Sequence, residues 1–410
     1  MKQASTSRAA AGKMLLPVYV PTALLAFGQG LLVPTLPFYS SSLGAPAGLI
    51  GFIVAAAGIG TLIADVPAGA ILGRMGRRPA MLMGAGLVAI STFVIGLWAN
   101  IPALIALRLL AGIGTALWGI SRHAYITDVI APAQRGRSIA VFGGINRTGN
   151  LLAPAAGGFI GQAFGLNSPF LVAGVLAGAT AILAYITVPE SAVRSSGSAG
   201  HKMRWALVGG MIRTHWRDLS AAGIAQIFAQ MIRAGRQLLI PLYGKSLGLE
   251  VGTVGTILSI AAALDVAMFL PAGFMMDRFG RKVAAVPSFA VMAVGMIVVA
   301  AAFDFRSLLL GAAIIGFGNG LGSGTMMTLG ADLAPPGAVG EFLGFWRLIG
   351  DSGQSSGPII VGTTADIFGL TTTALILSGI GAAAALTLAL LVRETRTDDP
   401  VPAPAISDRR

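Results

Sequence analysis

A ten-residue sequence that occurs twice constrains the fold of this chain more than any other feature. Gly69-Ala-Ile-Leu-Gly-Arg-Met-Gly-Arg-Arg78 returns 204 residues later as Gly273-Phe-Met-Met-Asp-Arg-Phe-Gly-Arg-Lys282, and each copy joins two long apolar segments. The same offset relates Tyr39 to Tyr243, Gly44 to Gly248, Asp128 to Asp332, Gly149 to Gly353 and Pro154 to Pro358. The sequence therefore predicts two homologous halves. A repeat this long is typical of membrane transporters, whereas soluble repeat proteins use periods of a few tens of residues.

The composition is that of a chain embedded in lipid. Hydrophobic residues make up 55% of it and charged residues 11%, with 57 glycines. A membrane helix needs roughly 20 apolar residues, and glycine allows membrane helices to pack closely. Twelve such segments are predicted, near residues 14–39, 48–72, 79–98, 101–126, 136–161, 168–189, 219–246, 250–275, 283–303, 306–331, 340–365 and 369–392. The glycines of segment 306–331 are expected to serve packing alone.

We therefore predict an all-α integral membrane protein of two six-helix bundles related by a pseudo-twofold axis. The bundles comprise residues 14–189 and 219–392, with a polar, basic linker at 190–218 and terminal tails at 1–13 and 393–410. Of the 28 lysines and arginines, 20 fall in the tails, the linker and the loops of one side, and two fall in loops of the other side. Because cytoplasmic loops are enriched in basic residues, we expect both termini in the cytoplasm of a cell whose inner (plasma) membrane holds the chain.

Several classes of protein are excluded or disfavoured. The net charge of +12 follows membrane topology and is not gathered on one domain, so no nucleic-acid partner is expected. No cysteine is present, and we expect no metal site and no cofactor. Gly244-Lys245-Ser246 imitates the end of a phosphate-binding loop, but Leu239 stands at the position of the required first glycine. No cleavable signal peptide is apparent, because the first apolar run is too long for one. We expect that the chain is not an enzyme.

Three motifs resemble those of the major facilitator superfamily, and the chain is similar to its twelve-span proton-coupled drug antiporters. Gly69 to Arg78 resembles the loop signature between spans 2 and 3, and Arg108 followed by Gly112, Gly114 and Ala116 resembles the span 4 signature. Gly149, Pro154, Gly157 and Gly158 resemble the span 5 signature of antiporters, with Ala153 where a glycine is usual. The resemblance implies alternating access, a monomer, and a cavity lined by spans 1, 4, 7 and 10.

The loop signature departs from the family pattern in its first copy. An aspartate normally precedes Arg74, but Gly73 stands there, while the second copy keeps Asp277. In the family this acid helps to latch the inner gate, so the two halves are expected to be unequal gates. Arg77 or Arg78 is expected to pair with Asp128, and Arg281 with Asp332. The residues assigned to gating are Gly69, Arg74, Gly76, Arg77, Arg78, Asp128, Asp277, Arg278, Arg281 and Asp332.

Charged residues inside the predicted spans are functional candidates, because a charge in the membrane is costly. The acids are Asp65, Asp265 and Asp351, and the arginines are Arg108, Arg122, Arg147, Arg233, Arg236 and Arg347. A buried carboxylate near an arginine suits proton coupling, since its proton affinity changes with its neighbours. We assign Asp351 first, then Asp65 and Asp265, with Arg108 modulating such a carboxylate as in the family. His123 is expected to be structural rather than titrating.

The repeat places Arg147 and Asp351 at equivalent positions, where they could meet across the pseudo-twofold axis as an ion pair or as part of a binding site. The predicted substrate surface comprises Gln29, Arg122, Arg147, Asn150, Arg233, Arg236 and Asn319. Arg233 and Arg236 share a helix face and could clamp a carboxylate or phosphate; alternatively, either could pair with Asp265 or Asp351.

The function expected from the sequence is proton-coupled antiport. It would export small organic or amphipathic compounds, and the surplus of arginines favours anionic ones. A proton-coupled symporter or facilitator that takes up an organic anion shares the fold and remains the alternative, and a channel or receptor is a remote one. The partners expected are the substrate, protons and the lipid bilayer.

Overall fold

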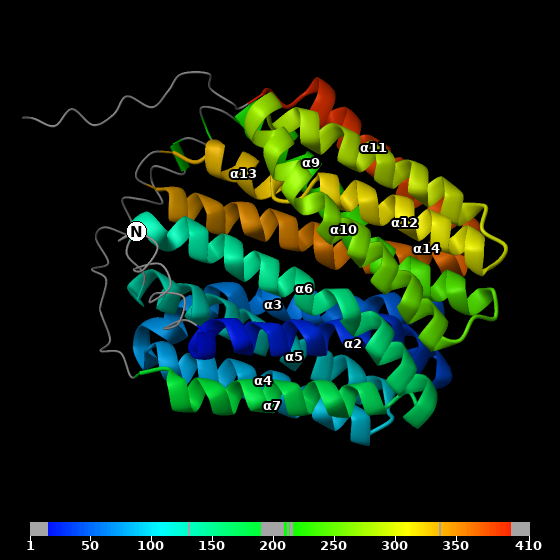
Figure 1. The fold of residues 1–410 in the computed structure, drawn as a ribbon, viewed down its shortest axis with the longest axis horizontal. Coiled ribbons are helices and arrows are strands. Elements are labelled where there is room, and N and C mark those ends of the chain that lie inside the picture. Colours follow the sequence, from blue (N-terminus) through cyan, green and yellow to red (C-terminus); the bar gives the residue numbers. More distant parts are fainter. Residues whose placement is uncertain are drawn as a thin grey trace, which may run out of the picture.

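The computed structural model describes residues 15–129, 132–189, 209–210, 213, 216–335 and 338–394, without the side chains of 66, 127–129, 132–142, 217 and 218. The first half opens with a π-helical turn, η1 (Leu15–Tyr19). It continues through α2 (Val20–Ser42), α3 (Ala47–Met75), α4 (Arg77–Leu97), α5 (Ile101–Val129), α6 (Pro132–Phe164) and α7 (Ser168–Thr187). The second half contains α9 (Trp216–Ser246), α10 (Val251–Phe279), α11 (Arg281–Ala300), α12 (Phe305–Leu321), α13 (Thr325–Asp332) and α14 (Val339–Leu390). Figure 1 shows the two bundles lying side by side.

The predicted all-α membrane fold is confirmed. Within the described residues, nine helices are long and apolar enough to cross a membrane. The predicted spans correspond to the observed helices when α12 and α13 are taken as one broken span and α14 as two spans that meet at Gly369, where φ is 79°. Several helices run past the predicted ends, as α3 does to Met75, because a helix continues where hydropathy falls.

The repeat recurs in the backbone. Three pairs of glycines with positive φ are each 204 residues apart: Gly44 with Gly248, Gly76 with Gly280, and Gly165 with Gly369. They occupy the corresponding turns of the two halves, where a left-handed conformation is accessible to glycine at little cost. Hydroxyl groups repeat as well, since Tyr39 donates to the carbonyl of Ile95 and Tyr243 to that of Ala300.

Span 10 breaks this symmetry. Its glycines pack closely as expected at Gly316, Gly318, Gly320 and Gly322, but the expectation of packing alone was wrong for Gly324. The helix ends at Leu321, and a new one begins at Thr325 after Gly324, whose φ is 79°. The position 204 residues earlier is Ile120, which lies within the unbroken helix α5. The glycine run therefore ends where the helix is interrupted, and the interruption leaves backbone groups free of helical hydrogen bonds.

The halves meet along two pairs of helices, α3 with α14 and α6 with α10. At the end that carries Gly44 and Gly248, backbones touch: a Cβ on Gly51 would collide with Pro358 and Gly362, and one on Gly158 with Val251 and Gly252. Asp366 of α14 accepts hydrogen bonds from the backbone nitrogens of Ala47 (2.9 Å) and Gly48 (2.7 Å). We call this the closed end.

Toward the other end, which carries the Gly76 and Gly280 turns, the same helix faces part. Gly69 continues the contact face of α3, Gly344 that of α14, Gly144 that of α6 and Gly273 that of α10. A Cβ on any of these four glycines would meet nothing within 4 Å. We call this the open end, and the structure is a conformation open on one side only.

Candidate functional site

The first cluster of charges at the junction between the halves centres on Asp265 of α10. Arg147 of α6 donates to Asp265 Oδ1 at 2.7 Å, and Asn319 of α12 donates to Oδ2 at 2.6 Å. Arg236 of α9 lies 3.8 Å from Oδ2. The Arg147 guanidinium also lies over the ring of Phe269, 5.1 Å from its centroid. Asp265 therefore joins α6 of one half to three helices of the other.

The second cluster lies at the other junction, between α3 and α14. The carboxyl groups of Asp65 and Asp351 face each other, close enough for a proton on one to form a hydrogen bond to the other. Arg347, one turn before Asp351 on α14, donates from Nε to Asp351 Oδ2 at 3.3 Å. Arg122, buried on α5, feels the charge of Arg347. An acid from each half thus meets beside one contacting arginine among the described residues, Arg347.

The predicted encounter of Arg147 with Asp351 was wrong. Equivalent positions lie on opposite sides of the pseudo-twofold axis, so Arg147 faces α10 while Asp351 faces α3. The 204-residue register itself holds. Arg147 contacts Phe269, Asp351 faces Asp65, and Phe269 lies 204 residues after Asp65. The two junctions are therefore alike in geometry and opposite in chemistry: one contains an ion pair, the other an acid pair.

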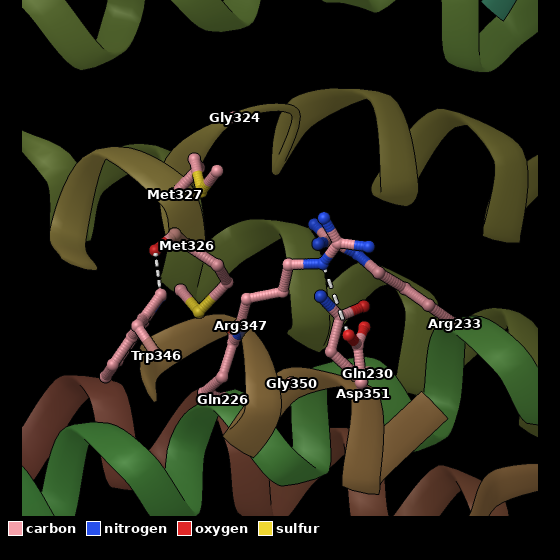
Figure 2. Close-up of a pocket in the computed structure, with 10 residues that line it drawn as sticks. All are labelled: Gln226, Gln230, Arg233, Gly324, Met326, Met327, Trp346, Arg347, Gly350 and Asp351. Carbon is pink, nitrogen blue, oxygen red and sulfur yellow. Dashed lines mark hydrogen bonds and ion pairs between the residues drawn. The ribbon is translucent and has the colours of Figure 1, made fainter. Parts of the chain in front are cut away.

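A pocket of about 170 Å³ adjoins the acid pair in the second half (Figure 2). It lies between α9, the break in span 10 and the first part of α14. Its lining comprises Gln226, Gln230, Arg233, Gly324, Met326, Met327, Trp346, Arg347, Gly350 and Asp351. Amides, charges, thioethers and an indole give this pocket apolar walls with a few polar groups, a combination that small-molecule sites share.

Of this lining, the sequence analysis assigned Arg233 and Asp351 to a site and named Arg347 among the functional candidates. Gln226, Gln230 and Arg233 are spaced four and three residues apart, so they share one face of α9. Such a polar stripe in a span was a signal that could have identified this wall. Trp346 carried no comparable signal; it is buried and donates to the carbonyl of Met326 at 2.9 Å.

The predicted clamp of Arg233 and Arg236 does not form. Arg236 approaches Asp265, which is one of the alternatives considered, while Arg233 donates to the carbonyl of Gly322 at 2.8 Å and lies over the Phe289 ring at 5.1 Å. The break in span 10 supplies that free carbonyl. Arg233 therefore holds the break, and its side chain borders the pocket.

Other predicted residues lie apart from the pocket lining. Arg108 donates to the carbonyl of Val54 at 3.5 Å, and no described carboxylate contacts it. Asn150 bonds back to Asn146 on its own helix at 2.9 Å, and Gln29 is exposed on α2. His123 donates from Nδ1 to the carbonyl of Gly119 at 2.7 Å, as a structural histidine does.

The predicted pair of Arg281 and Asp332 is present at the open end, with Arg281 Nε 2.8 Å from Asp332 Oδ2. The carboxylate of Glu394 also accepts from the backbone nitrogens of Arg281 (2.9 Å) and Lys282 (3.0 Å) at the start of α11. An anion at this position complements the helix dipole. No described contact tests the role of Asp277 as a latch.

The first copy of the loop is arranged differently. Arg78 donates to the carbonyl of Tyr185 at 2.7 Å and lies over the Tyr185 ring, 4.8 Å from its centroid. The predicted partner Asp128 has a side chain outside the described part of the structure, so its pairing with Arg77 or Arg78 stays a prediction.

The span 5 signature packs against both neighbours of α6. Gly149 and Gly157 face α2, where added Cβ atoms would meet Ala26 and the backbone of Leu31. Gly158 and Pro154 face α10 of the other half, and the Pro154 carbonyl lies against Gly255. The signature therefore lets one helix approach its own bundle and the opposite bundle closely.

Comparison with known proteins assigns the family. A family model described as the Major Facilitator Superfamily matches residues 19–234 and again 222–410, which together cover nearly the whole chain. The chain belongs to the major facilitator superfamily. It is a secondary transporter in a membrane, not an enzyme.

Three known proteins illustrate the likeness. An uncharacterized MFS-type transporter of Methanocaldococcus jannaschii is 21% identical over 353 residues, covering 86% of this chain and 91% of that protein. Multidrug resistance protein 2 of Bacillus subtilis is 28% identical over 164 residues, which are 40% of this chain and 41% of that protein. The crystal structure of a D-xylose-proton symporter has a TM-score of 0.75 at 20% identity, covering 93% of this chain and 98% of that one, and shares the fold.

Proposed function

We propose that this superfamily member is a proton-coupled antiporter that exports amphipathic organic compounds across the plasma membrane. One observation carries the proposal: Asp351 belongs both to the acid pair at the junction and to the lining of the pocket. A group that binds the proton and also faces the substrate can couple the two. Asp265, by contrast, is occupied by Arg147 and Asn319.

The coupling follows from competition for Asp351. With its proton, Asp351 presents a neutral carboxyl group to the pocket; without it, Asp351 presents an anion. A cationic or strongly hydrogen-bonding substrate binds the anion better, so proton and substrate exclude one another. Mutually exclusive binding at one site that faces either side in turn is antiport.

The orientation of the structure follows from the basic residues. The Gly76 and Gly280 turns, with Arg74, Arg77, Arg78, Arg278 and Arg281 beside them, lie at the open end. Placing this basic end in the cytoplasm agrees with the general charge bias of membrane proteins. We therefore assign both termini to the cytoplasm and the observed conformation to the inward-open state.

Two further observations support export. The span 5 signature packs α6 against the opposite half as well as its own, so α6 can carry movement between them. The name of the Bacillus subtilis relative is that of a multidrug resistance protein. Neither observation specifies a substrate.

Proton-coupled uptake of an organic anion is the second candidate. Arg233 and Arg347 both border the pocket (Figure 2). An anion bound there would accompany a proton on Asp351 rather than compete with it, because the proton releases Arg347 from its carboxylate. Substrate charge and direction of coupling are thus linked: cations accord with antiport and anions with symport.

A transport assay separates proposed export from uncoupled flux. The purified protein in proteoliposomes is given an imposed pH gradient, with ethidium as the cationic probe and fluorescein as the anionic one. We expect the gradient to drive accumulation of ethidium, and Asp351→Asn to abolish accumulation above equilibrium. Asp366→Asn, an acid at the closed end outside the pocket, serves as the control and retains gradient dependence. Equal flux with and without the gradient would overturn the proposal.

A further inference from the structure

The acid pair is chemically incomplete. Asp65 Oδ1 is buried without a hydrogen-bond donor among the described residues. The group that faces Asp65 is the Asp351 carboxyl, which has no donor of its own unless protonated. Two ionised carboxylates in contact repel each other, so such pairs share one proton. A single proton therefore supplies both the missing donor and the missing attraction.

The charged groups around the pair do not replace this proton. On α14, Arg347 contacts Asp351 through Oδ2, and it acts on Asp65 only through its charge. Arg122 and His123 of α5 lie further back and feel the charge of Arg347. On α9, Arg233 is held by the carbonyl of Gly322. One contacting guanidinium cannot neutralise two carboxylates.

The position of the pair gives the proton a mechanical role. Contacts between α3 and α14 run from the closed end inward: Gly48 lies at Asp366, Gly51 at Gly362 and Gly58 at Ser355. Asp65 and Asp351 meet further along this line. Beyond them, a Cβ on Gly69 or Gly344 would meet nothing within 4 Å. The pair therefore lies where the two helices begin to part, beside the pocket.

The opposite junction lacks such a switch. At the equivalent position between α6 and α10, Arg147 and Asp265 carry opposite charges and attract each other, and Asn319 donates to the second carboxylate oxygen. The junction of α6 and α10 thus holds a permanent ion pair, about which the halves can rock. The other brings two like acids together.

We propose that Asp65 and Asp351 together bind one proton that holds α3 against α14, and that loss of this proton opens the closed end. The inference deepens the proposed antiport, because it makes proton release to the cytoplasm the event that favours the outward-open state. The substrate, by binding the freed Asp351, accompanies that change.

Substitution by asparagine distinguishes this clamp from ordinary packing. In Asp65→Asn, the amide donates a hydrogen bond to ionised Asp351, so the junction holds without a proton. In Asp65→Asn/Asp351→Asn, two amides bond to each other and neither can ionise. Both variants are expected to keep the closed end shut at every pH.

The measurement uses the absence of native cysteine from this chain. Spin labels are placed at Ser42→Cys and Arg306→Cys, two exposed positions at the closed ends of opposite halves. Their distance distribution is recorded in nanodiscs over a range of pH without substrate. We expect the unsubstituted pair to shift from the shorter to the longer distance as pH rises, and both asparagine variants to remain at the shorter one. Asp366→Asn removes another acid of the same interface. It weakens the closed end at every pH but is expected to retain the change of distance with pH, because Asp366 has no acid partner among the described residues.

A wild-type distance that does not change with pH, or an asparagine double variant that shifts as wild type does, would overturn the clamp. Thermal unfolding of each variant verifies folding, and the single variant tests the proposal if the double variant fails to fold. The transport assay tests the proposed antiport separately. If a pH gradient drives accumulation but the distance between the labels does not depend on pH, antiport is supported and the clamp is refuted.

Discussion

Asp265→Ala is expected to destabilise the folded protein more than the loss of either other intramembrane acid. The substitution removes the carboxylate that Arg147, Arg236 and Asn319 share, and leaves two guanidinium groups between the halves without their partner. Removing one member of a buried ion pair typically costs about 3–5 kcal/mol. Because the Arg147 side chain is 30% exposed, we expect the lower end of this range, about 3 kcal/mol.

Thermal unfolding in detergent measures this effect. The matched control is Asp366→Asn, whose carboxylate lies at the exposed closed end and accepts only backbone hydrogen bonds. A second comparison is Arg147→Met/Asp265→Leu, which removes both members of the pair and should recover much of the loss, because it leaves fewer uncompensated charges. An Asp265→Ala variant that unfolds at the temperature of the control would show that the ion pair does not join the halves.

Gly51→Leu and Gly69→Leu are expected to abolish transport by blocking opposite ends of the protein. Both residues lie on the face of α3 that points to α14. At Gly51 a side chain would collide with Pro358 and Gly362 and prevent closure of the closed end. At Gly69 there is open space in the observed state. Under alternating access this space closes when the halves rock, so the side chain should block the opposite state.

The spin-label pair at 42 and 306 distinguishes the two variants. Gly51→Leu is expected to give the longer distance and Gly69→Leu the shorter one, at any pH. Overpacking costs about 1–3 kcal/mol, which shifts a two-state equilibrium by roughly 5- to 150-fold. Gly178→Leu is the control, since Gly178 of α7 also has nothing within 4 Å but lies away from both junctions. The same distance in all three variants would contradict rocking about the charged junctions.

The repeat allowed most of the fold to be predicted. A 204-residue offset and twelve apolar segments imply two bundles, and the turns at Gly44, Gly76 and Gly165 recur at Gly248, Gly280 and Gly369. The break in span 10 was missed because glycines such as Gly322 and Gly324 are equally common on the packing face of an unbroken membrane helix. Only the tertiary partner, the guanidinium of Arg233 at the Gly322 carbonyl, distinguishes a break from a close contact.

The candidate site was predictable in its charges but not in their pairing. Asp65, Asp265 and Asp351 were identifiable because acids in a membrane span are costly. Their partners depend on which helices of the two halves touch, and Arg147 and Asp351, though equivalent in register, each meet a different helix. The contact between Asp65 and Asp351 joins positions 286 residues apart that carry like charges. No pattern in the sequence favours such a pair.

Proton movement recorded during substrate flux tests the central claim of antiport most directly. Proteoliposomes are loaded with a pH-sensitive dye at low buffer capacity, and a transported compound is added outside with no initial pH gradient. If the protein is an antiporter, substrate that enters drives protons out, so the interior becomes more alkaline; the signal should be absent in Asp351→Asn. Acidification of the interior would show that substrate and proton move together, and would contradict export in favour of uptake.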